Sequence, residues 1–250
     1  MSYKLFHLDI ETIPNNSYHF QDYNQNISPV FQNAEGFPIT FAVKQYGKKK
    51  VITDSIANYH DMKDFKKQWL VDGKDDFDIE LITNLHQIIG DADVICGHNV
   101  DKFDLKKIYA RMLKYGMPPP KQPKIIDTYK IAKKYFNLRS NRLQHLLEVL
   151  DIGSKVEHEG GAMWVKFIEG DKQAIRNMLK YNKGDVALFD EVLDALLPWA
   201  GSEIPDPRLF KVKAEDSTKL PAELRVCPRC SATGTAINSW GMFPSHDRSE

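Results

Sequence analysis

The pattern at the start of the chain is that of a strand with one polar face. In residues 4–11, apolar side chains at Phe6, Leu8 and Ile10 alternate with polar ones, which is the period of two expected for a half-buried strand. The last two polar positions of this segment are Asp9 and Glu11. We therefore expect a strand whose polar face ends in two carboxylates.

The pattern is irregular in the next segment and then strand-like again. Residues 15–38 are rich in Asn, Gln and aromatic side chains without a clear period. They predict a long loop, and long loops in compact domains are often functional. Residues 39–46 and 51–55 are apolar runs separated by Gly47 and three lysines, which favours a hairpin.

Helical periodicity begins after the hairpin. Leu81, Leu85 and Ile88 belong to an apolar stripe that ends near Gly90, which predicts a helix. Residues 93–97 predict a short buried strand and are followed by a helix from about residue 102. Strands followed by a helix, a strand and another helix are typical of an α/β domain.

The second half of the chain is predicted to be mainly helical. Residues 128–136 and 142–150 favour two helices, and Asp127 is the expected N-cap of the first. The glycine-containing stretch 153–170 predicts a loop. A long helical segment is expected over residues 171–197, broken or kinked around Gly184.

Length and composition indicate one substantial core. The chain has 250 residues and 42% hydrophobic residues, which suits one domain with a small appendage. Several prolines after residue 197 predict a domain over residues 1–200 and a tail over 201–250. Because no apolar run reaches about 20 residues and no signal-peptide pattern opens the chain, we expect no membrane segment and a cytoplasmic location.

The charges are unevenly distributed along the chain. The net charge is zero, but residues 102–142 contain twelve basic residues and two acids, a balance of 12 − 2 = +10. Such a region can supply contacts to phosphates even in a neutral protein. Taken one by one, most of these side chains are expected to be solvated helix faces.

Two carboxylates on one strand suggest a cation. Asp9 and Glu11 are two residues apart, so both point the same way with their Cα atoms about 6 to 7 Å apart. Carboxylates at this spacing repel each other unless a proton or a cation lies between them. A hard ion such as Mg²⁺ prefers oxygen ligands. Alone the pair is a weak signal, since acids at a strand end are usually just solvated.

Two further acids lie on apolar helix faces. Asp104 shares a predicted face with Ile108 and Met112, so it would point toward the core, although a capping role is the simpler interpretation of that segment alone. Asp185 shares a face with Tyr181, four residues earlier. Its simpler interpretation is an acid beside a core tyrosine.

Together these segments match known motifs. Asp9-Ile-Glu11, Asn99 to Asp104 and Tyr181 to Asp185 resemble, in order and spacing, the motifs DxE, Nx₃FD and Yx₃D. These are the motifs of the DEDD, or DnaQ-like, 3′→5′ exonuclease superfamily, in its tyrosine-bearing branch, which includes the proofreading domains of family B DNA polymerases. The resemblance covers about residues 1–197, and three ordered motifs are far more specific than one.

The resemblance implies a fold, an activity and a set of roles. The fold would be α/β, an RNase H-like mixed sheet flanked by helices. The substrate would be nucleic acid with a free 3′ end, with single-stranded DNA favoured and RNA left open. Tyr181 would orient the attacking water. Two Mg²⁺ or Mn²⁺ ions would be held by Asp9, Glu11, Asp104 and Asp185. The terminal nucleotide would be contacted by Thr12, Asn99 and Phe103.

Other interpretations have to be weighed against this one. The fold could serve as a catalytically inactive nucleic-acid-binding module, although such a module would be free to lose one of the four acids or the tyrosine, and all are present. The loop aromatics could stack on bases of the strand end or cover the core. They are Tyr18, Phe20, Tyr23, Phe31 and Phe37.

The tail contains one further motif. Cys227 and Cys230 form a CxxC pair that resembles half of a zinc ribbon. A structural Zn²⁺ takes four ligands, and only His246 follows downstream. The second half of a ribbon could be missing, ligands could come from elsewhere in the chain, or the pair could bind nothing. Cys96 stands alone, so no disulfide framework is visible and a reducing compartment is expected.

Overall fold

A computed structural model describes residues 4–20, 26–153 and 160–200. Residues 4–196 form one compact unit, which contains the sheet described below. The predicted tail, residues 201–250, lies outside the described residues, and so do Cys227 and Cys230.

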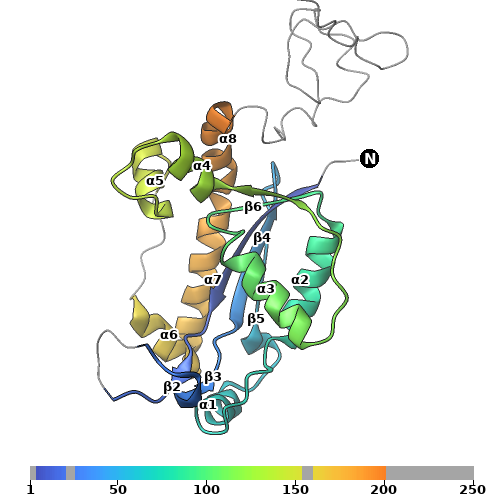
Figure 1. Cartoon of the computed structure of the whole chain (residues 1–250), viewed down its shortest axis with the longest axis vertical. Helices are drawn as coiled ribbons and strands as arrows, with labels where there is room; N and C mark the ends of the chain where they lie inside the picture. Colours follow the sequence, from blue (N-terminus) through green and yellow to red (C-terminus); the bar gives the residue numbers. More distant parts are fainter. Residues whose placement is uncertain (1–3, 21–25, 154–159, 201–250) are drawn as a thin grey trace, which may run out of the picture. The chain divides into compact units, whose positions relative to one another are not determined.

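A five-stranded mixed sheet organises the fold, with strand order β5-β4-β1-β6-β7. The strands are β1 (Leu5–Thr12), β4 (Pro38–Gln45), β5 (Val51–Ser55), β6 (Val94–Gly97) and β7 (Lys124–Asp127). The first three are antiparallel neighbours, whereas β6 runs parallel to both β1 and β7. The central position of β1 makes it the strand that both halves of the sheet share (Figure 1).

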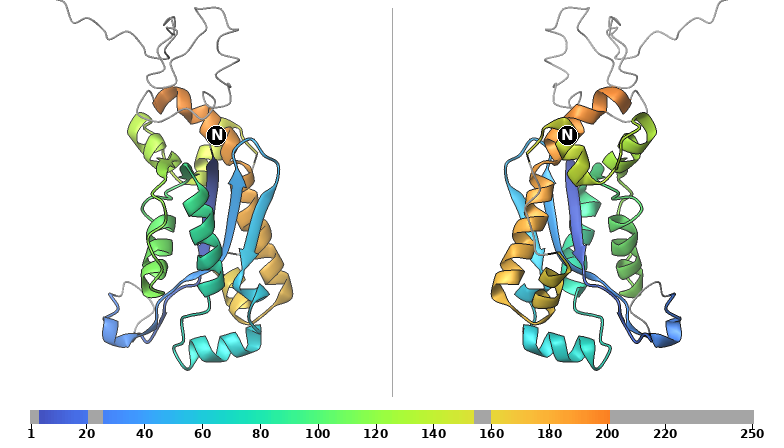
Figure 2. Two further views of the ribbon diagram at one scale, coloured as in Figure 1. Left: turned by 90° about the vertical axis from the view of Figure 1, so that its right-hand side faces the viewer. Right: turned by 90° about the vertical axis from the view of Figure 1, so that its left-hand side faces the viewer.

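Helices flank the sheet on both faces, so the predicted α/β architecture, a mixed sheet flanked by helices, is confirmed. Figure 2 shows α2 and α3 on one side of the strands and α7 on the other. None of the helices within the described ranges is long and apolar enough to cross a membrane. The helices are α1 (Met62–Leu70), α2 (Ile79–Asp91), α3 (Asp104–Lys114), α4 (Thr128–Tyr135), α5 (Leu143–Leu150), α6 (Gly161–Ile168), α7 (Lys172–Ala187) and α8 (Phe189–Ala200).

The core fills the space between the sheet and these helices. Strand β4 is buried over its whole length except Gln45, because helices cover both of its faces. Phe37, Ile39 and Phe41 join the apolar sides of α2, α3 and α7 in one cluster. The central strands are therefore held from both faces, which makes β1 a firm base for side chains at its end.

The predicted loop at residues 15–38 contains some regular structure. Strand β2 (Asn16–Ser17) pairs with β3 (Gln32–Ala34), and a short 3₁₀ helix, η1 (Pro29–Phe31), precedes β3. Strands of two or three residues are too short for a period of two to be visible in sequence. The segment is thus an excursion between β1 and β4 with its own small ladder.

The aromatic residues of this excursion divide into two groups. Phe37 is fully buried in the core, whereas Tyr18 and Phe20 are largely exposed. Phe31 is partly exposed and meets Phe20 edge to face, with ring centroids 5.5 Å apart. Tyr23 lies outside the described residues. Phe37 therefore covers the core, whereas Tyr18 and Phe20 do not.

One expectation for the second half was wrong, and the position of another needs correction. The predicted loop at 153–170 contains α6, whose buried residues Met163 and Phe167 are one helical turn apart. The last helical segment is broken as expected, but the break between α7 and α8 falls at Leu188 and Gly184 lies inside α7. Glycine costs only about 1 kcal/mol in a helix, so packing overrides its propensity.

Candidate active site

The last residues of β1 have no backbone pairing with β6, its neighbour in the sheet. Strand β6 pairs only with the first part of β1, from Leu5 to His7, and then leaves the sheet after Gly97. The Asp9 and Glu11 part of β1 is paired on the other side with β4. Both acids are partly exposed, whereas Ile10 between them is buried. The two carboxylates therefore flank a backbone position that β6 leaves unpaired.

Asp104 fills the position that β6 vacates. It is the first residue of α3, is 3% exposed, and its Oδ1 accepts a hydrogen bond from the backbone N–H of Ile10 at 3.0 Å. The expectation that Asp104 points toward the core is confirmed. Burial raises the pKa of Asp104 to about 7, although the hydrogen bond from Ile10 opposes the shift. Its surroundings thus favour a proton or a cation at the carboxylate.

The turn between β6 and α3 is held by Asp127. Its carboxylate accepts hydrogen bonds from the backbone N–H groups of Asn99 at 2.9 Å and Asp101 at 3.3 Å. The same carboxylate caps α4 through the N–H groups of Tyr129 and Lys130. The predicted cap is confirmed, and it has a second task that sequence did not indicate. It anchors the turn that delivers Asp104.

The turn itself needs an unusual backbone. Asn99 adopts a left-handed conformation with φ of 67°, which Asn tolerates better than most residues. Gly97 is required for a different reason, because a Cβ there would lie 2.7 Å from the backbone oxygen of Leu8. These two residues let β6 approach β1 closely and then turn away from it.

Helix α7, which packs against β1 and β4, carries the third motif. Tyr181 and Asp185 are both buried, with 9% and 2% of their surface exposed. Asn182, next to the tyrosine, is fully buried, and its side-chain Nδ2 donates a hydrogen bond to Oδ2 of Asp9 at 2.5 Å. Its Oδ1 has no hydrogen-bond partner within the described ranges. Helix α7 is thus tied directly to the first acid.

Sequence reasoning missed Asn182. An uncharged polar residue inside a motif carries no chemical signature of its own. The only available signal is its place beside Tyr181 on a helix with alternating burial. Its contact with Asp9 joins residues 173 positions apart, a separation that no local pattern reports.

Asp9, Glu11 and Asp104 lie at one strand end, but the four predicted acids do not form a metal cage within the described residues. In the described part of the chain, no group of three or more His, Cys, Asp or Glu side chains is arranged to hold a metal ion. Their assignment as ligands therefore stays a prediction. The residue types fit a hard divalent ion, which takes carboxylate oxygens. Asp104 also fits, because no ion pair of the described residues compensates its buried charge.

The predicted nucleotide contacts lie around this strand end. Phe103 is 44% exposed and precedes Asp104 directly, while Asn99 and Thr12 are partly buried. The backbone oxygen of Thr12 accepts a hydrogen bond from Trp164 Nε1 at 3.0 Å. An exposed aromatic ring next to a candidate metal ligand is suited to stacking. The role of all three stays a prediction.

Part of the positive charge of residues 102–142 is neutralised in the folded protein. Several basic residues of this segment pair with acids that lie outside it, and Arg111 is buried in such a pair. The region is therefore not a uniform phosphate-binding face. The pairs are Arg111 with Asp78, Lys114 with Asp75, Lys121 with Asp93 and Lys130 with Asp101.

A mixed five-stranded sheet with helices on both faces, and acids at the end of its central strand, defines an RNase H-like protein. The RNase H superfamily model matches residues 42–197, more than half of the chain. The chain therefore belongs to the RNase H superfamily. The matched range begins after β1, so it does not include Asp9 and Glu11. No curated protein matches the chain.

One solved structure with a similar fold is the family B DNA polymerase from the hyperthermophilic archaeon Pyrobaculum calidifontis. The two share 15% sequence identity with a TM-score of 0.53. The similarity covers 91% of this chain and 28% of the polymerase chain. At this identity the likeness shows a shared fold, and this chain spans about a quarter of the polymerase's length.

Proposed function

We propose that the protein is a metal-dependent 3′→5′ exonuclease that removes nucleotides from the 3′ end of single-stranded DNA. The observation that carries the proposal is the buried Asp104 carboxylate, bonded to Ile10 between Asp9 and Glu11. A carboxylate placed there, with no basic partner among the residues that the structure describes, suits a divalent cation. Membership of the RNase H superfamily supports a nuclease-type hydrolase.

The residues divide the work of hydrolysis. Asp9, Glu11, Asp104 and Asp185 would hold two Mg²⁺ or Mn²⁺ ions. When bound, these ions would activate the attacking water and stabilise the departing oxygen. Tyr181, one turn from Asp185 on α7, would orient the water toward phosphorus. The bond to the 3′ oxygen of the preceding nucleotide breaks, and a nucleoside 5′-monophosphate leaves.

The direction and the substrate follow from the motif resemblance. The three motifs are arranged as in polymerase proofreading domains, which favours a single-stranded DNA end, and RNA is the second substrate to test. We expect the protein to act in the cytoplasm. A catalytically inactive nucleic-acid-binding module is the alternative, but no observation on these residues favours it over the enzyme.

The deciding experiment is digestion of 5′-labelled single-stranded DNA with Mg²⁺ or Mn²⁺. We expect a ladder that shortens from the 3′ end, and none with EDTA or with Asp9→Ala. Asp72→Ala, which removes an exposed acid that belongs to none of the three motifs, is the matched control and should cleave like the wild type. Intact DNA and intact RNA with a retained gel shift would instead establish the binding module.

A further inference from the structure

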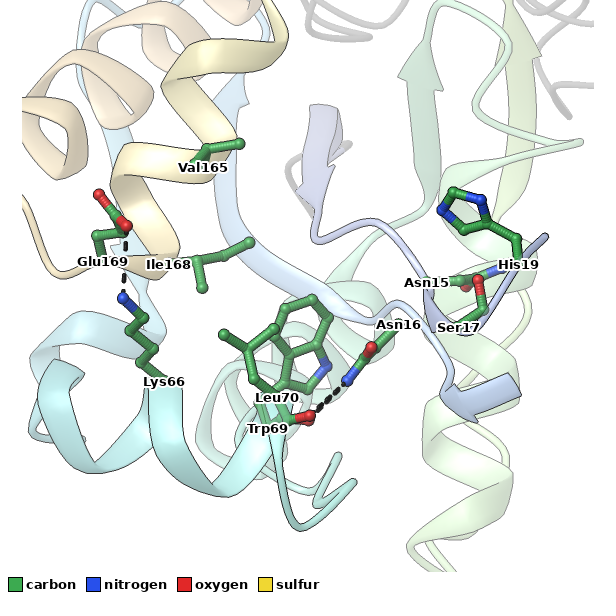
Figure 3. Close-up of a pocket in the computed structure, with 10 residues that line it drawn as sticks. All are labelled: Asn15, Asn16, Ser17, His19, Lys66, Trp69, Leu70, Val165, Ile168 and Glu169. Atoms are coloured by element: carbon green, nitrogen blue, oxygen red, sulfur yellow. Dashed lines mark hydrogen bonds and ion pairs between the residues drawn. The ribbon is translucent and has the colours of Figure 1, made fainter. Parts of the chain in front are cut away.

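A pocket lies beside the strand end, next to β2 and between α1 and α6 (Figure 3). Its volume is about 330 Å³. The described parts of three segments far apart in the sequence contribute to its wall. The lining residues used below are Asn16, Lys66, Trp69, Leu70, Val165 and Glu169.

The pocket is connected to the candidate active site through the chain itself. Asn16 follows Glu11 by five residues, so their Cα atoms are at most about 18 Å apart. The α6 wall is joined to the end of β1 by the hydrogen bond from Trp164 to Thr12. A strand with its 3′ end at the acids of β1 therefore has this pocket within reach of its preceding nucleotides.

The lining combines an apolar floor with groups that form hydrogen bonds. Trp69, Leu70 and Val165 provide the apolar surface, and the Asn16 side chain donates to the backbone oxygens of Trp69 and Leu70 at 3.0 and 3.2 Å. A flat ring with a polar edge, such as a nucleobase, matches this combination. An isolated phosphate does not, because Lys66 already pairs with Glu169 at 3.4 Å.

Trp69 adds an observation that points to a ligand. The residue is 2% exposed, and its indole Nε1 has no hydrogen-bond partner in the ranges that the structure describes. A buried donor without an acceptor costs about 1–3 kcal/mol. In Figure 3 the indole nitrogen is on the side of the ring that faces Asn16. A shift of the Asn16 side chain would open this donor to an acceptor on a bound base.

We propose that this pocket binds a nucleobase of the single strand, upstream of the nucleotide that is removed. The proposal rests on the proposed exonuclease function for the direction of the strand. A released nucleoside monophosphate presents the same base, so the test has to separate the strand from the free nucleotide.

The test uses the full chain and a variant that fills the pocket. Val165 is 57% exposed and lines the pocket, so Val165→Phe would occupy it without disturbing the core. Ala162→Phe places the same ring on an exposed position of α6 outside the lining and is the control. Cleavage is measured on an oligonucleotide of about twelve residues and on a dinucleotide.

We expect Val165→Phe to raise KM for the longer strand about 5–10-fold with kcat unchanged, because a stacked base contributes to binding and not to the chemical step. The dinucleotide and the Ala162→Phe variant should behave as in the wild type. Equal KM values for Val165→Phe and wild type on the longer strand would overturn the proposal while leaving the exonuclease intact.

A second readout does not need cleavage. In ¹⁵N-labelled protein with EDTA, the longer strand should shift one indole N–H resonance, assigned to Trp69 because Trp69→Phe lacks it. If the wild type cuts nothing and this shift remains, the proposed activity fails and the base site stands. Deoxyadenosine monophosphate should shift it only weakly. A saturating shift with the monophosphate and none with the strand would assign the pocket to the free product and overturn the proposal.

Discussion

At the scale of one residue, the buried charge of the Asp104 carboxylate lowers the stability of the folded protein. Its Oδ1 is needed by the Ile10 N–H, but its negative charge is buried. Burial raises its pKa to about 7, above the ordinary value of about 3.9. Between about pH 4 and pH 7, the carboxyl group is ionised in the unfolded chain but still protonated in the metal-free folded chain. The free energy of unfolding therefore falls as the pH rises through this range.

Asp104→Asn should separate these two effects. The amide oxygen can still accept from Ile10, so in EDTA at pH 8 the free energy of unfolding should rise by about 1–3 kcal/mol. The gain should shrink toward pH 4. Cleavage should fall about 100-fold or more, since a metal ligand is lost. Urea unfolding at both pH values, together with the DNA assay, checks this. A variant less stable than wild type at pH 8 would contradict it.

Asn182 is expected to act as a positioning residue. Its hydrogen bond to Asp9 Oδ2 fixes the orientation of a carboxylate that we propose as a metal ligand. Asn182→Ala should lower kcat or metal affinity by about 10–100-fold. The Mg²⁺ concentration for half-maximal rate should rise while KM for DNA stays constant. Asn177→Ala on the same helix is the control. An unchanged Mg²⁺ dependence would reduce Asn182 to a packing role.

At the scale of elements, polar contacts fasten α7 and α8 to the sheet. Asn182 contacts Asp9, and Asp190 of α8 contacts His7, two residues earlier on β1. Asp190 contacts His7 Nε2 at 2.7 Å and Lys44 Nζ at 3.0 Å. Burial alone would raise the pKa of Asp190, but the hydrogen bonds from His7 and Lys44 outweigh it and lower the pKa to about 2. The segment that ends α7, and carries Asp185, is thereby held beside β1.

Asp190→Asn should weaken this attachment in a pH-dependent way. A carboxylate with a lowered pKa contributes stability above its unfolded pKa of about 3.9, and loses it as the pH falls toward about 2. At pH 7 the variant should be less stable by about 1–2 kcal/mol, and the difference should disappear near pH 2. Chemical denaturation across this range measures it. A constant difference at all pH values would show that lost packing is responsible.

At the scale of the whole molecule, the described core belongs to residues 4–196. All four acids and Tyr181 lie within that unit. A domain with its own core can fold alone. The predicted zinc pair of the tail is outside it, so cleavage and tail can be tested separately.

A chain that ends after Ala200 should therefore fold and cleave single-stranded DNA at a rate within about threefold of the full chain. Circular dichroism and the DNA assay check the two statements. Zinc content of the full chain, compared with the shortened one, tests the Cys227 and Cys230 pair. An aggregated or inactive shortened chain would show that the tail contributes to the catalytic unit.

Much of the fold could be predicted from local pattern. The alternation of residues 4–11, the two runs of the β4–β5 hairpin and the apolar stripes of α2, α3 and α5 each report a buried face within a few residues. The order of the three motifs was equally visible, because each motif is a short segment. Strand β2 was not predicted, because two residues leave no periodicity to detect. Strand β7 and helix α1 were also not predicted.

The meeting of these segments depends on packing between distant residues. Asp104 reaches Ile10 across 94 positions and Asn182 reaches Asp9 across 173. The partner of each is chosen by where β6 ends and how α7 crosses the sheet. The same holds for the acids that neutralise Arg111 and Lys130. Local sequence specifies which face of an element is apolar, whereas the burial of a charge and the partner that it meets arise only when the elements pack together.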